Sequence, residues 1–84
     1  MVELTVRYFA GARAAAGVAQ ESVALSGGAT VAHVLEAVRE RHDDRLARVL
    51  AASSFLLDGV AVRDRDTPVP EGALLDVLPP FAGG

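Results

Sequence analysis

The chain begins with a regular alternation of apolar and polar side chains over residues 2–9, VELTVRYF. One face of this segment would carry Val2, Leu4, Val6 and Tyr8, and the other Glu3, Thr5, Arg7 and Phe9. Because successive side chains of a strand point to opposite faces, the alternation predicts a half-buried strand. Residues 21–25, ESVAL, alternate in the same way and are expected to pair with it as a hairpin. The small, glycine-bounded stretch 10–17 between them predicts a loop or one helical turn.

A helical period replaces the alternation after residue 30. Apolar side chains recur three and four positions apart at Val31, Val34, Leu35 and Val38, which is the buried stripe of an amphipathic helix. Thr30, at the end of the turn SGGAT, is a typical N-cap residue. We therefore expect a helix over 31–42. The apolar residues beyond it either continue this helix or form a second short one: Leu46, Val49 and Leu50.

The last third of the chain returns to strand patterns. Residues 54–62, SFLLDGVAV, predict a strand, an Asp-Gly turn and a second strand. Residues 63–72 are polar and contain Pro and Gly, which indicates a loop. The stretch 73–78, ALLDVL, is largely apolar and predicts a central strand that lies beside the first one and is buried on both faces. Pro79 should end it, because proline has no N–H group to donate to a sheet.

This order of elements predicts the fold class. A strand pair, a helix and further strands form an α+β layout, with the helix packed across one sheet face. The order is compatible with a β-grasp (ubiquitin-like) fold, in which one main helix crosses a mixed sheet. With 84 residues the chain has room for one small domain. We place that domain at 1–78 and a flexible Pro-Pro-x-x-Gly-Gly tail at 79–84.

The composition indicates which classes of partner are improbable and in which compartment the protein is expected. The net charge is −3, and all eight basic residues are arginine, so the chain is a poor candidate for nucleic-acid binding. Acidic residues interleave with the local arginine cluster at Arg39, Arg41, Arg45 and Arg48, which predicts a solvated helix face. There is no cysteine, which excludes disulfides and a thiol nucleophile. No apolar run approaches the roughly 20 residues of a membrane span, and we expect a cytoplasmic protein without a membrane partner.

Nothing in the predicted domain suggests catalysis or a metal. His33 and His42 would lie on opposite faces of one helix, so they should be surface histidines that share no metal. Asp64 and Asp66 lack the glycine and distal glutamate of a calcium loop and indicate a polar turn. Gly27 and Gly28 indicate a helix-entry turn rather than a phosphate site. We expect no cofactor bound by this chain and no independent enzyme.

The terminal sequence LPPFAGG is the part that suggests chemistry. Pro79 and Pro80 favour an extended path, and the tail of six residues can reach roughly 20 Å from the domain. Two glycines have no side chain and can enter a narrow channel. The free carboxylate of Gly84 is ionised at neutral pH and can attack the α-phosphate of ATP. A tail of this kind suits delivery of a carboxylate into the active site of another protein, which would supply ATP and Mg²⁺.

Several motifs resemble the MoaD/ThiS family of ubiquitin-like sulfur carriers, and most of all the small subunits of molybdopterin synthases. They are VRYFAGARAAAG, TVAHVLEAV, LLDGVAV and PEGALLDVLPPFAGG, and together they cover essentially the whole chain. The terminal Pro-Pro-x-x-Gly-Gly is the specific part of the resemblance. The chain departs from the family where Ala73 and Leu74 replace a frequent Asp-Glu, where Asp58 replaces a frequent Asn, and where Asp76 interrupts the last strand.

The resemblance implies a carrier role. Gly84 would be adenylated by a ubiquitin-activating-like adenylyltransferase and then converted to a thiocarboxylate with sulfur from a donor protein. The residues that would enter the partner's active site are Pro79, Pro80, Phe81, Ala82 and Gly83. In a molybdopterin synthase that partner is the large subunit. Phe9 and Leu78 correspond to apolar residues that contact partners in the family, although core packing would also explain them.

Alternatives remain open at the level of the sequence. Similar carriers serve cysteine synthesis, thiamine synthesis and tRNA thiolation, and Pro-Pro before the tail favours molybdopterin. A ubiquitin-like interaction module with an inert tail would also fit a domain without a catalytic set. The chain contains no lysine, so it offers no lysine acceptor for an isopeptide bond. It is therefore more plausible as a donor than as an acceptor.

Overall fold

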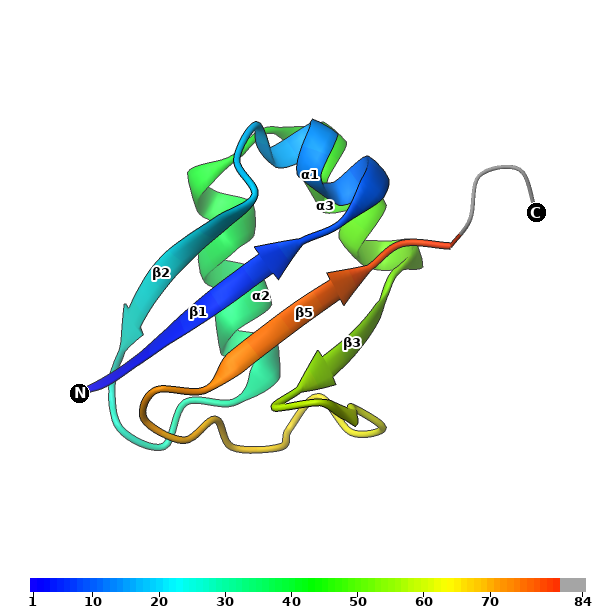
Figure 1. The fold of residues 1–84 in the computed structure, drawn as a ribbon. Coiled ribbons are helices and arrows are strands. Elements are labelled where there is room, and N and C mark those ends of the chain that lie inside the picture. The colour runs from blue at the N-terminus through cyan, green and yellow to red at the C-terminus, as the bar shows by residue number, and fades with distance from the viewer. Residues whose placement is uncertain (81–84) are drawn as a thin grey trace.

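A computed structural model describes residues 1–80 of the chain. Within these residues three helices and a five-stranded sheet of order β2-β1-β5-β3-β4 are present (Figure 1). The strands are β1 (Val2–Tyr8), β2 (Gln20–Leu25), β3 (Ser54–Leu57), β4 (Val60–Ala61) and β5 (Leu74–Leu78), and the helices are α1 (Ala10–Ala16), α2 (Val31–Arg41) and α3 (Asp44–Ala52). The predicted α+β, β-grasp architecture with a mixed sheet is confirmed.

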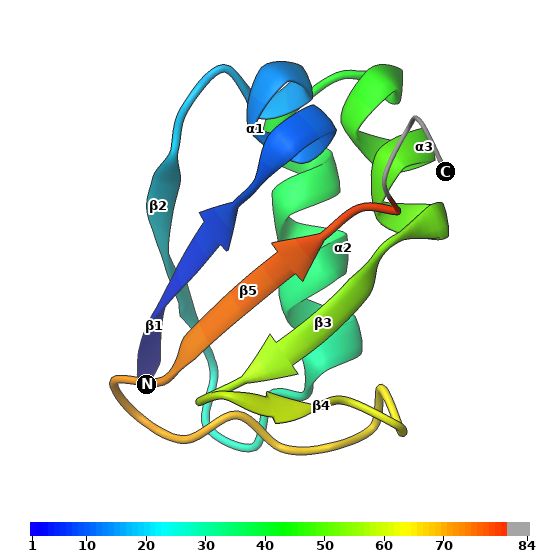
Figure 2. The ribbon, with the colours of Figure 1, turned by 45° about the vertical axis from the view of Figure 1, so that its right-hand side comes forward.

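The two central strands run in parallel. β5 pairs with β1 from Thr5–Leu74 to Tyr8–Val77, while β2 and β3 flank them in antiparallel orientation. The sequence correctly predicted that the apolar strand 73–78 would lie beside the first strand. The predicted burial on both faces is only partial, because Leu74 and Leu78 are half-buried. Because β1 and β5 are parallel, their carboxyl ends lie at the same edge of the sheet, and the chain leaves the domain there (Figures 1 and 2).

The main helix begins where its cap was predicted. The hydroxyl oxygen of Thr30 accepts a hydrogen bond from the backbone N–H of His33 at 3.4 Å, and the backbone N–H of Thr30 donates to His33 Nδ1 at 3.0 Å. This reciprocal arrangement is a capping box with histidine in place of the usual Glu or Gln. The helix ends at Arg41, one residue before its predicted end, because His42 adopts an extended backbone.

The helices α3 and α1 bear on two predictions: α3 decides between the alternatives given for the residues after 42, and α1 differs from the predicted loop. The open choice after residue 42 is settled by α3, a separate helix whose N-cap Asp43 accepts a hydrogen bond from the N–H of Arg45 at 3.0 Å. The stretch 10–17 forms the seven-residue helix α1, longer than the predicted loop or single turn. Its alanines have high helix propensity, and Gly17 ends it at φ 79°. As a result β1 and β2 pair as predicted, but through a helical connection and not a tight hairpin.

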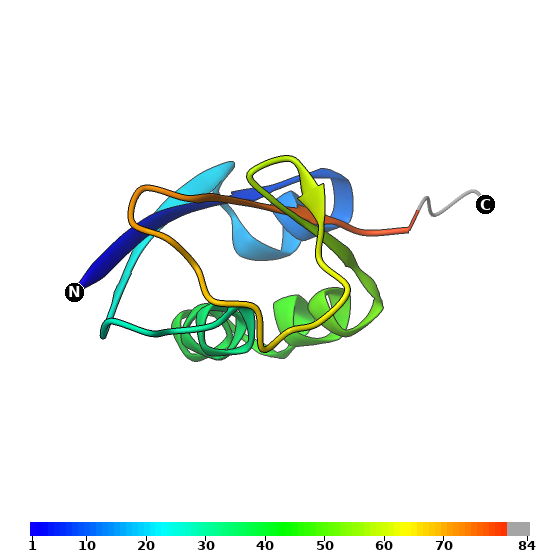
Figure 3. The same ribbon diagram turned by 90° about the horizontal axis from the view of Figure 1, so that it is seen from below.

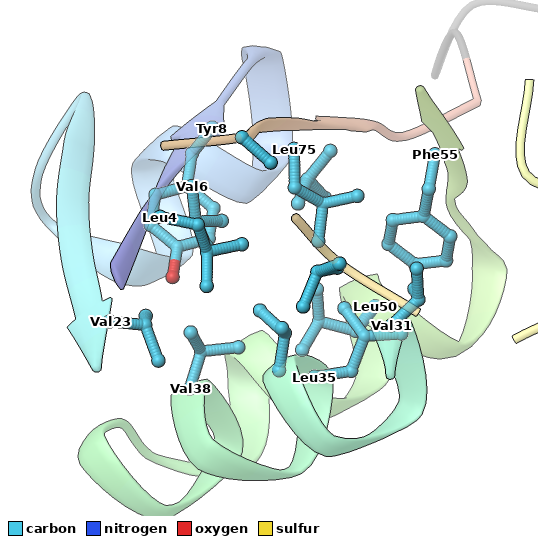
Figure 4. Packing of buried hydrophobic residues seen from close by; sticks show 14 of the residues in the cluster. Leu4, Val6, Tyr8, Val23, Val31, Leu35, Val38, Leu50, Phe55 and Leu75 are labelled. Carbon is cyan, nitrogen blue, oxygen red and sulfur yellow. The ribbon is translucent and has the colours of Figure 1, made fainter. Parts of the chain in front are cut away.

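One hydrophobic core lies between the sheet and the helices (Figure 4). The inward side chains of β1, β2, β3 and β5 meet the apolar stripe of α2 and two leucines of α3. The buried set includes Leu4, Val6, Tyr8, Val23, Phe55, Leu75 and Val77 from the strands, and Val31, Val34, Leu35, Val38, Leu46 and Leu50 from the helices. Every one of the four stripe positions predicted in α2 is therefore a core position.

The two sheet faces differ in their cover. Figure 3 shows α2 and α3 on the same side of the sheet, while the other side carries no helix within residues 1–80. We call the uncovered side the outer face; β1 and β5 present on it Thr5, Arg7, Leu74, Asp76 and Leu78. No helix in the described part of the chain is both long and apolar enough to cross a membrane.

Candidate functional site

The carboxyl end of β5 positions the predicted tail. Leu78 pairs with Ser54 of β3 and is half-buried, Pro79 is half-buried, and Pro80 is exposed. β5 is held on both sides, by β1 and by β3, up to its last residues. The direction in which the chain leaves the sheet is therefore fixed by two neighbouring strands. The remaining predicted tail residues, Phe81, Ala82, Gly83 and Gly84, lie outside the described residues, so the predicted boundary of the tail stays a prediction.

Phe9 lies at the same edge of the sheet as the end of β5. It follows directly after β1, is 39% exposed and does not belong to the core. The next residue, Ala10, has φ 48°, a left-handed conformation that is uncommon for a residue other than glycine. This turn of the backbone leads straight into α1. Of the two predicted partner contacts, Phe9 is thus exposed and Leu78 is half-buried.

An ion pair occupies the outer face next to these apolar residues. Arg7 Nε donates to Asp76 Oδ1 at 2.7 Å, and Arg7 Nη2 donates to Asp76 Oδ2 at 3.1 Å. The two residues are direct partners in the parallel β1–β5 ladder. The guanidinium carbon of Arg7 lies 5.6 Å from the centre of the Phe9 ring, a cation–π contact. The pair and the ring together form a continuous group on the two central strands.

The opposite face of β1 carries a second polar cluster, built on Glu21 of β2. Glu21 Oε2 accepts from the Tyr8 hydroxyl at 2.5 Å and from His42 Nε2 at 2.6 Å, and Oε1 accepts from Arg41 Nη1 at 3.1 Å. Arg41 also donates to the backbone oxygen of Ser22 at 2.7 Å. The cluster ties β1, β2 and the end of α2 together.

The pKa values in this cluster follow from burial and hydrogen bonding. Burial alone would raise the pKa of Glu21, but hydrogen bonds from Tyr8, His42 and Arg41 outweigh it and lower the pKa below its ordinary value. Burial, reinforced by the Glu21 carboxylate, raises the pKa of the Tyr8 hydroxyl. Glu21 therefore stays ionised and Tyr8 stays neutral over the physiological range. The cluster is a structural tie and offers no free general base.

The other candidate residues resolve into structural roles. His42 is not a surface histidine as predicted: its side chain is only 16% exposed, because it turns back from the end of α2 to bind Glu21. His33 is an exposed capping residue. Asp64 accepts from the N–H of Asp66 at 2.9 Å, which confirms the predicted polar turn. Residues 1–80 contain no group of three potential metal ligands.

The Asp-Gly turn also supports the strand that precedes the tail. Asp58 and Gly59 adopt φ 49° and 83°, and they connect β3 to β4 as predicted. Asp58 Oδ1 accepts from the N–H of Leu74 at 2.9 Å, while its own N–H donates to the Leu74 oxygen at 2.8 Å. The aspartate at this position thus fixes the start of β5 as well as making a turn.

A hollow of about 430 Å³ lies beside the start of α2. Its lining includes the glycine turn and the exposed side of the helix, with Gly27, Gly28, His33 and Glu36. The hollow is next to the segment that precedes β5, since Ala29 and Thr30 contact Val69 and Pro68 there. It therefore lies at the opposite end of β5 from Pro79. This fits the predicted helix-entry turn, and nothing in it resembles a catalytic set.

Sequence reasoning missed both polar clusters. Their partners are far apart in the chain: 69 positions separate Arg7 from Asp76, and 21 separate Glu21 from His42. A local pattern cannot show such pairings. One signal was available, because Asp76 is the single charged residue in an otherwise apolar strand. A charge at a buried position needs a partner, and Arg7 stood on the polar side of the neighbouring strand.

Comparison with solved structures gives close matches over the whole chain. Subunit 1 of a molybdopterin converting factor from Pyrococcus furiosus matches with a TM-score of 0.86 at 28% identity, covering 96% of this chain and 100% of that one. SAMP1 from Haloferax volcanii matches with a TM-score of 0.87 at 27% identity, covering 98% and 99%. Subunit 1, in a complex with subunit 2 of the molybdopterin-converting factor from Helicobacter pylori, matches with 0.72 at 18% identity, covering 99% and 100%; this last likeness concerns the fold alone.

The sequence itself identifies the family. A comparison with curated proteins finds no match. The profile of the ThiS family matches residues 6–84, which include the end of β1, the helices α1, α2 and α3, and the terminal Gly-Gly. Fold, tail and profile agree on a group that comprises sulfur carriers and ubiquitin-like modifiers. The chain belongs to the ThiS family.

Proposed function

We propose that this chain is a sulfur carrier whose C-terminal glycine is adenylated, converted to a thiocarboxylate and used to donate sulfur for the synthesis of molybdopterin. The observation that carries the proposal is the terminal Gly-Gly, placed after a strand that is held on both sides at the edge of a ThiS-family domain. Residues 1–80 offer no group of three potential metal ligands as an alternative reactive centre.

The chemistry is divided between the carrier and its partners. An oxygen of the Gly84 carboxylate attacks the α-phosphate of ATP, and pyrophosphate leaves. A persulfide of a donor protein then attacks the acyl carbon and displaces AMP, which gives an acyl disulfide. A second thiol attacks the donor's sulfur and breaks this S–S bond, so that the Gly84 thiocarboxylate leaves and the donor is left as a disulfide. The carboxylate thus gains a leaving group that it lacks on its own. The ubiquitin-activating-like adenylyltransferase would hold ATP and Mg²⁺, because phosphoryl chemistry depends on them.

The partner we propose for sulfur transfer is a molybdopterin synthase large subunit, in whose active site the sulfur would pass to a pterin precursor. Likeness to subunit 1 of the Pyrococcus furiosus converting factor supports this, as does the Pro-Pro that precedes the tail. In such a complex the residues from Pro79 to Gly83 would lie in the partner, while the domain would dock through its surface beside the tail. Phe9 and Leu78 are candidates for that contact.

Similarity to SAMP1 favours a second candidate, a ubiquitin-like modifier. The same activated Gly84 would then be joined to an amine of another protein. Because the chain contains no lysine, it could not form chains through lysine side chains of its own copies. The two candidates share the adenylation step and differ only in the nucleophile that follows it.

Intact mass spectrometry of the untagged protein tests the proposal. The protein is incubated with Mg-ATP, the adenylyltransferase of its own cells and a sulfur donor. A product heavier by one sulfur in place of one oxygen, located at Gly84, is expected. The variant with one residue added after Gly84 should give no such product. Gly27→Ala is the matched control, since Gly27 has open space for a Cβ, and it should react as the wild type does.

Each outcome of this experiment has a distinct meaning. Sulfur incorporation in the extended variant would contradict the carrier role. A mass increase equal to that of a target protein, in place of sulfur, would favour the modifier. Failure of the wild-type protein to be adenylated at all would leave the domain as an interaction module with an inert tail.

A further inference from the structure

The ion pair on the outer face has an open side. A guanidinium carries five N–H groups, and Arg7 uses two of them toward Asp76. Among residues 1–80 no other group accepts from the Arg7 side chain, so three donors remain on the side away from the carboxylate. The Arg7 side chain is 41% exposed, whereas that of Asp76 is only 10% exposed. A molecule that approaches the outer face therefore meets the free donors of Arg7 and not the carboxylate of Asp76.

We propose that Arg7, held by Asp76, is a specificity-determining contact that binds a carboxylate side chain of the adenylating partner. The inference rests on the proposed carrier function and concerns the docking of the domain before the tail reacts. Phe9 and Leu78 would supply apolar contacts on either side of this polar contact. Arg7 is a positioning residue, since it would not touch ATP or the reacting carboxylate.

Stability alone does not explain the pair. Asp76 is buried in the central strand, and taking a carboxylate out of water is costly. Apolar side chains of similar volume at both positions would hold two strands together equally well or better. Leu74 and Leu78, the outer-face neighbours in the same strand, show that apolar residues are accommodated there. A role in recognition gives the charge a reason to be present.

The guanidinium of Arg7 is fixed in place before any partner arrives. Asp76 accepts two parallel hydrogen bonds from one edge of the guanidinium, and the centre of the Phe9 ring lies 5.6 Å from the guanidinium carbon. A free arginine side chain loses much rotamer freedom when a partner immobilises it. In this domain the Arg7 side chain is already ordered by folding, so little further conformational entropy is lost when a partner binds it. A contact through Arg7 therefore retains more of its binding energy.

A carboxylate is the group that best fits the open edge. Its two oxygens match two parallel N–H groups of a guanidinium, and such charge-assisted pairs are short and strong. A partner that covers the outer face would bury the free N–H groups of Arg7, and buried donors need acceptors. A purely apolar partner surface would leave them unpaired. The contact thereby selects partners that carry an acidic side chain at this point.

The position of the pair relates docking to the reaction. Asp76 lies in β5 only three positions before Pro79, and β5 is held by both neighbouring strands. A partner anchored at Arg7 therefore has the origin of the tail placed at a fixed distance from its own surface. The tail spans roughly 20 Å at most, so a shift in docking would move Gly84 away from the ATP site.

The test is the kinetics of adenylation, measured as ATP–pyrophosphate exchange with the adenylyltransferase of the same cells. The double variant Arg7→Leu/Asp76→Leu removes the donors while keeping apolar packing between the strands. We expect the KM for the carrier to rise about tenfold or more, because loss of a charged contact at an interface weakens binding by at least that factor. The kcat should stay within about twofold of the wild type. Thermal unfolding checks that the variant is folded.

Exchanging the two charged residues between the strands tests whether the position of the guanidinium matters for recognition or only the presence of an ion pair. Arg7→Asp/Asp76→Arg keeps an ion pair between β1 and β5 but moves the guanidinium to the other strand. A raised KM is expected again, since the donors no longer face the same point of the partner. Arg48→Leu, which removes an exposed arginine from α3 on the helix side, is the matched control and should leave KM unchanged.

The outcomes distinguish the two levels of inference. A wild-type chain that gives no exchange overturns the carrier function and this inference with it. If the wild type is adenylated and both double variants keep a KM within about twofold of it, the carrier function stands and the role of Arg7 is wrong. A loss of kcat without a change in KM would also contradict a docking role.

Discussion

Two neighbouring residues of β1, Arg7 and Tyr8, point to opposite faces of the sheet and show how differently the faces use polar groups. On the helix side, Tyr8 donates to a Glu21 carboxylate that also binds His42 and Arg41, so the cluster is closed. Within the described residues no buried side-chain polar atom lacks a partner. On the outer face, Arg7 donates only to Asp76 among the side chains of residues 1–80, through two of its five N–H groups. The polar groups on the covered face bind one another, and the donors left over on the outer face are the ones that we propose bind a partner.

The two faces should differ most in the free energy of unfolding that is lost when a leucine is replaced by alanine. Leu75 is fully buried against the helices, whereas its neighbour Leu74 is half-buried on the outer face. Leu75→Ala should lower the free energy of unfolding by about 2–5 kcal/mol, since it leaves a cavity in the core. Leu74→Ala should cost much less. Denaturant unfolding of both variants measures the contrast, and equal losses would show that the outer face is packed as tightly as the core.

The closed cluster predicts an effect that depends on pH. The pKa of Glu21 is lower in the folded protein than its ordinary value of 4.5. Its contribution to stability is therefore present above the unfolded pKa and is lost as the pH falls through the lower folded pKa. Glu21→Gln should reduce the free energy of unfolding by about 1–3 kcal/mol at pH 7, because hydrogen bonds to a charged acceptor are lost.

Denaturant unfolding at pH 7 and near pH 3 checks this second prediction. The stabilities of the wild type and Glu21→Gln should come closer at the acid end, because the contribution of Glu21 falls as the pH drops below its ordinary pKa and through the lower folded pKa. Glu36→Gln, on the exposed side of α2, is the matched control and should follow the wild type at both pH values. A constant difference between wild type and Glu21→Gln across this range would mean that the ionised carboxylate is not what stabilises the cluster.

A helix cap gives a smaller effect on the covered side. Thr30→Ala removes the side-chain oxygen that accepts from the N–H of His33, and such changes cost about 0.5–2 kcal/mol. We expect a value at the lower end, because the backbone N–H groups of Val31 and Ala32 are bound independently by the oxygens of Thr67 and Arg65. Thr30→Ser, which keeps the hydroxyl, should unfold at nearly the wild-type denaturant concentration. If both variants lose the same stability, the methyl group and not the cap is responsible.

Local patterns explain why much of the fold was predictable from the sequence. Alternation in 2–9 and the stripe from Val31 to Val38 record directly which side chains face the core. The apolar stretch 73–78 predicted a central strand, and β5 lies between β1 and β3 in the sheet. The length of α1 was underestimated because its alanine-rich sequence has no amphipathic stripe, although alanine strongly favours helix.

The polar groups were harder to predict, for a physical reason. Whether a charged residue is solvated or paired depends on the register between strands and on the packing of α2 over β2, which no local pattern contains. His42 illustrates this, since only the turn after Arg41 brings it to Glu21. The tail was identified from its sequence and from resemblance, and its role rests on the experiments proposed above. Asp58 was correctly predicted as a turn residue, but its contact with Leu74 was not foreseen.

Substitution of Phe9 should have the smallest effect on stability, and it tests directly whether the outer face differs from the covered face. This residue is exposed beside the open side of Arg7, so Phe9→Ala should change the free energy of unfolding by no more than about 0.5 kcal/mol. Val60→Ala, at a position 69% exposed, is the matched control for loss of an exposed apolar side chain. In adenylation assays Phe9→Ala should raise the KM for the carrier, because the ring no longer restrains the guanidinium or meets the partner, while Val60→Ala should not. If Phe9→Ala unfolds as easily as Leu75→Ala does, the outer face contributes to stability as the covered face does, and the division between the two faces is wrong.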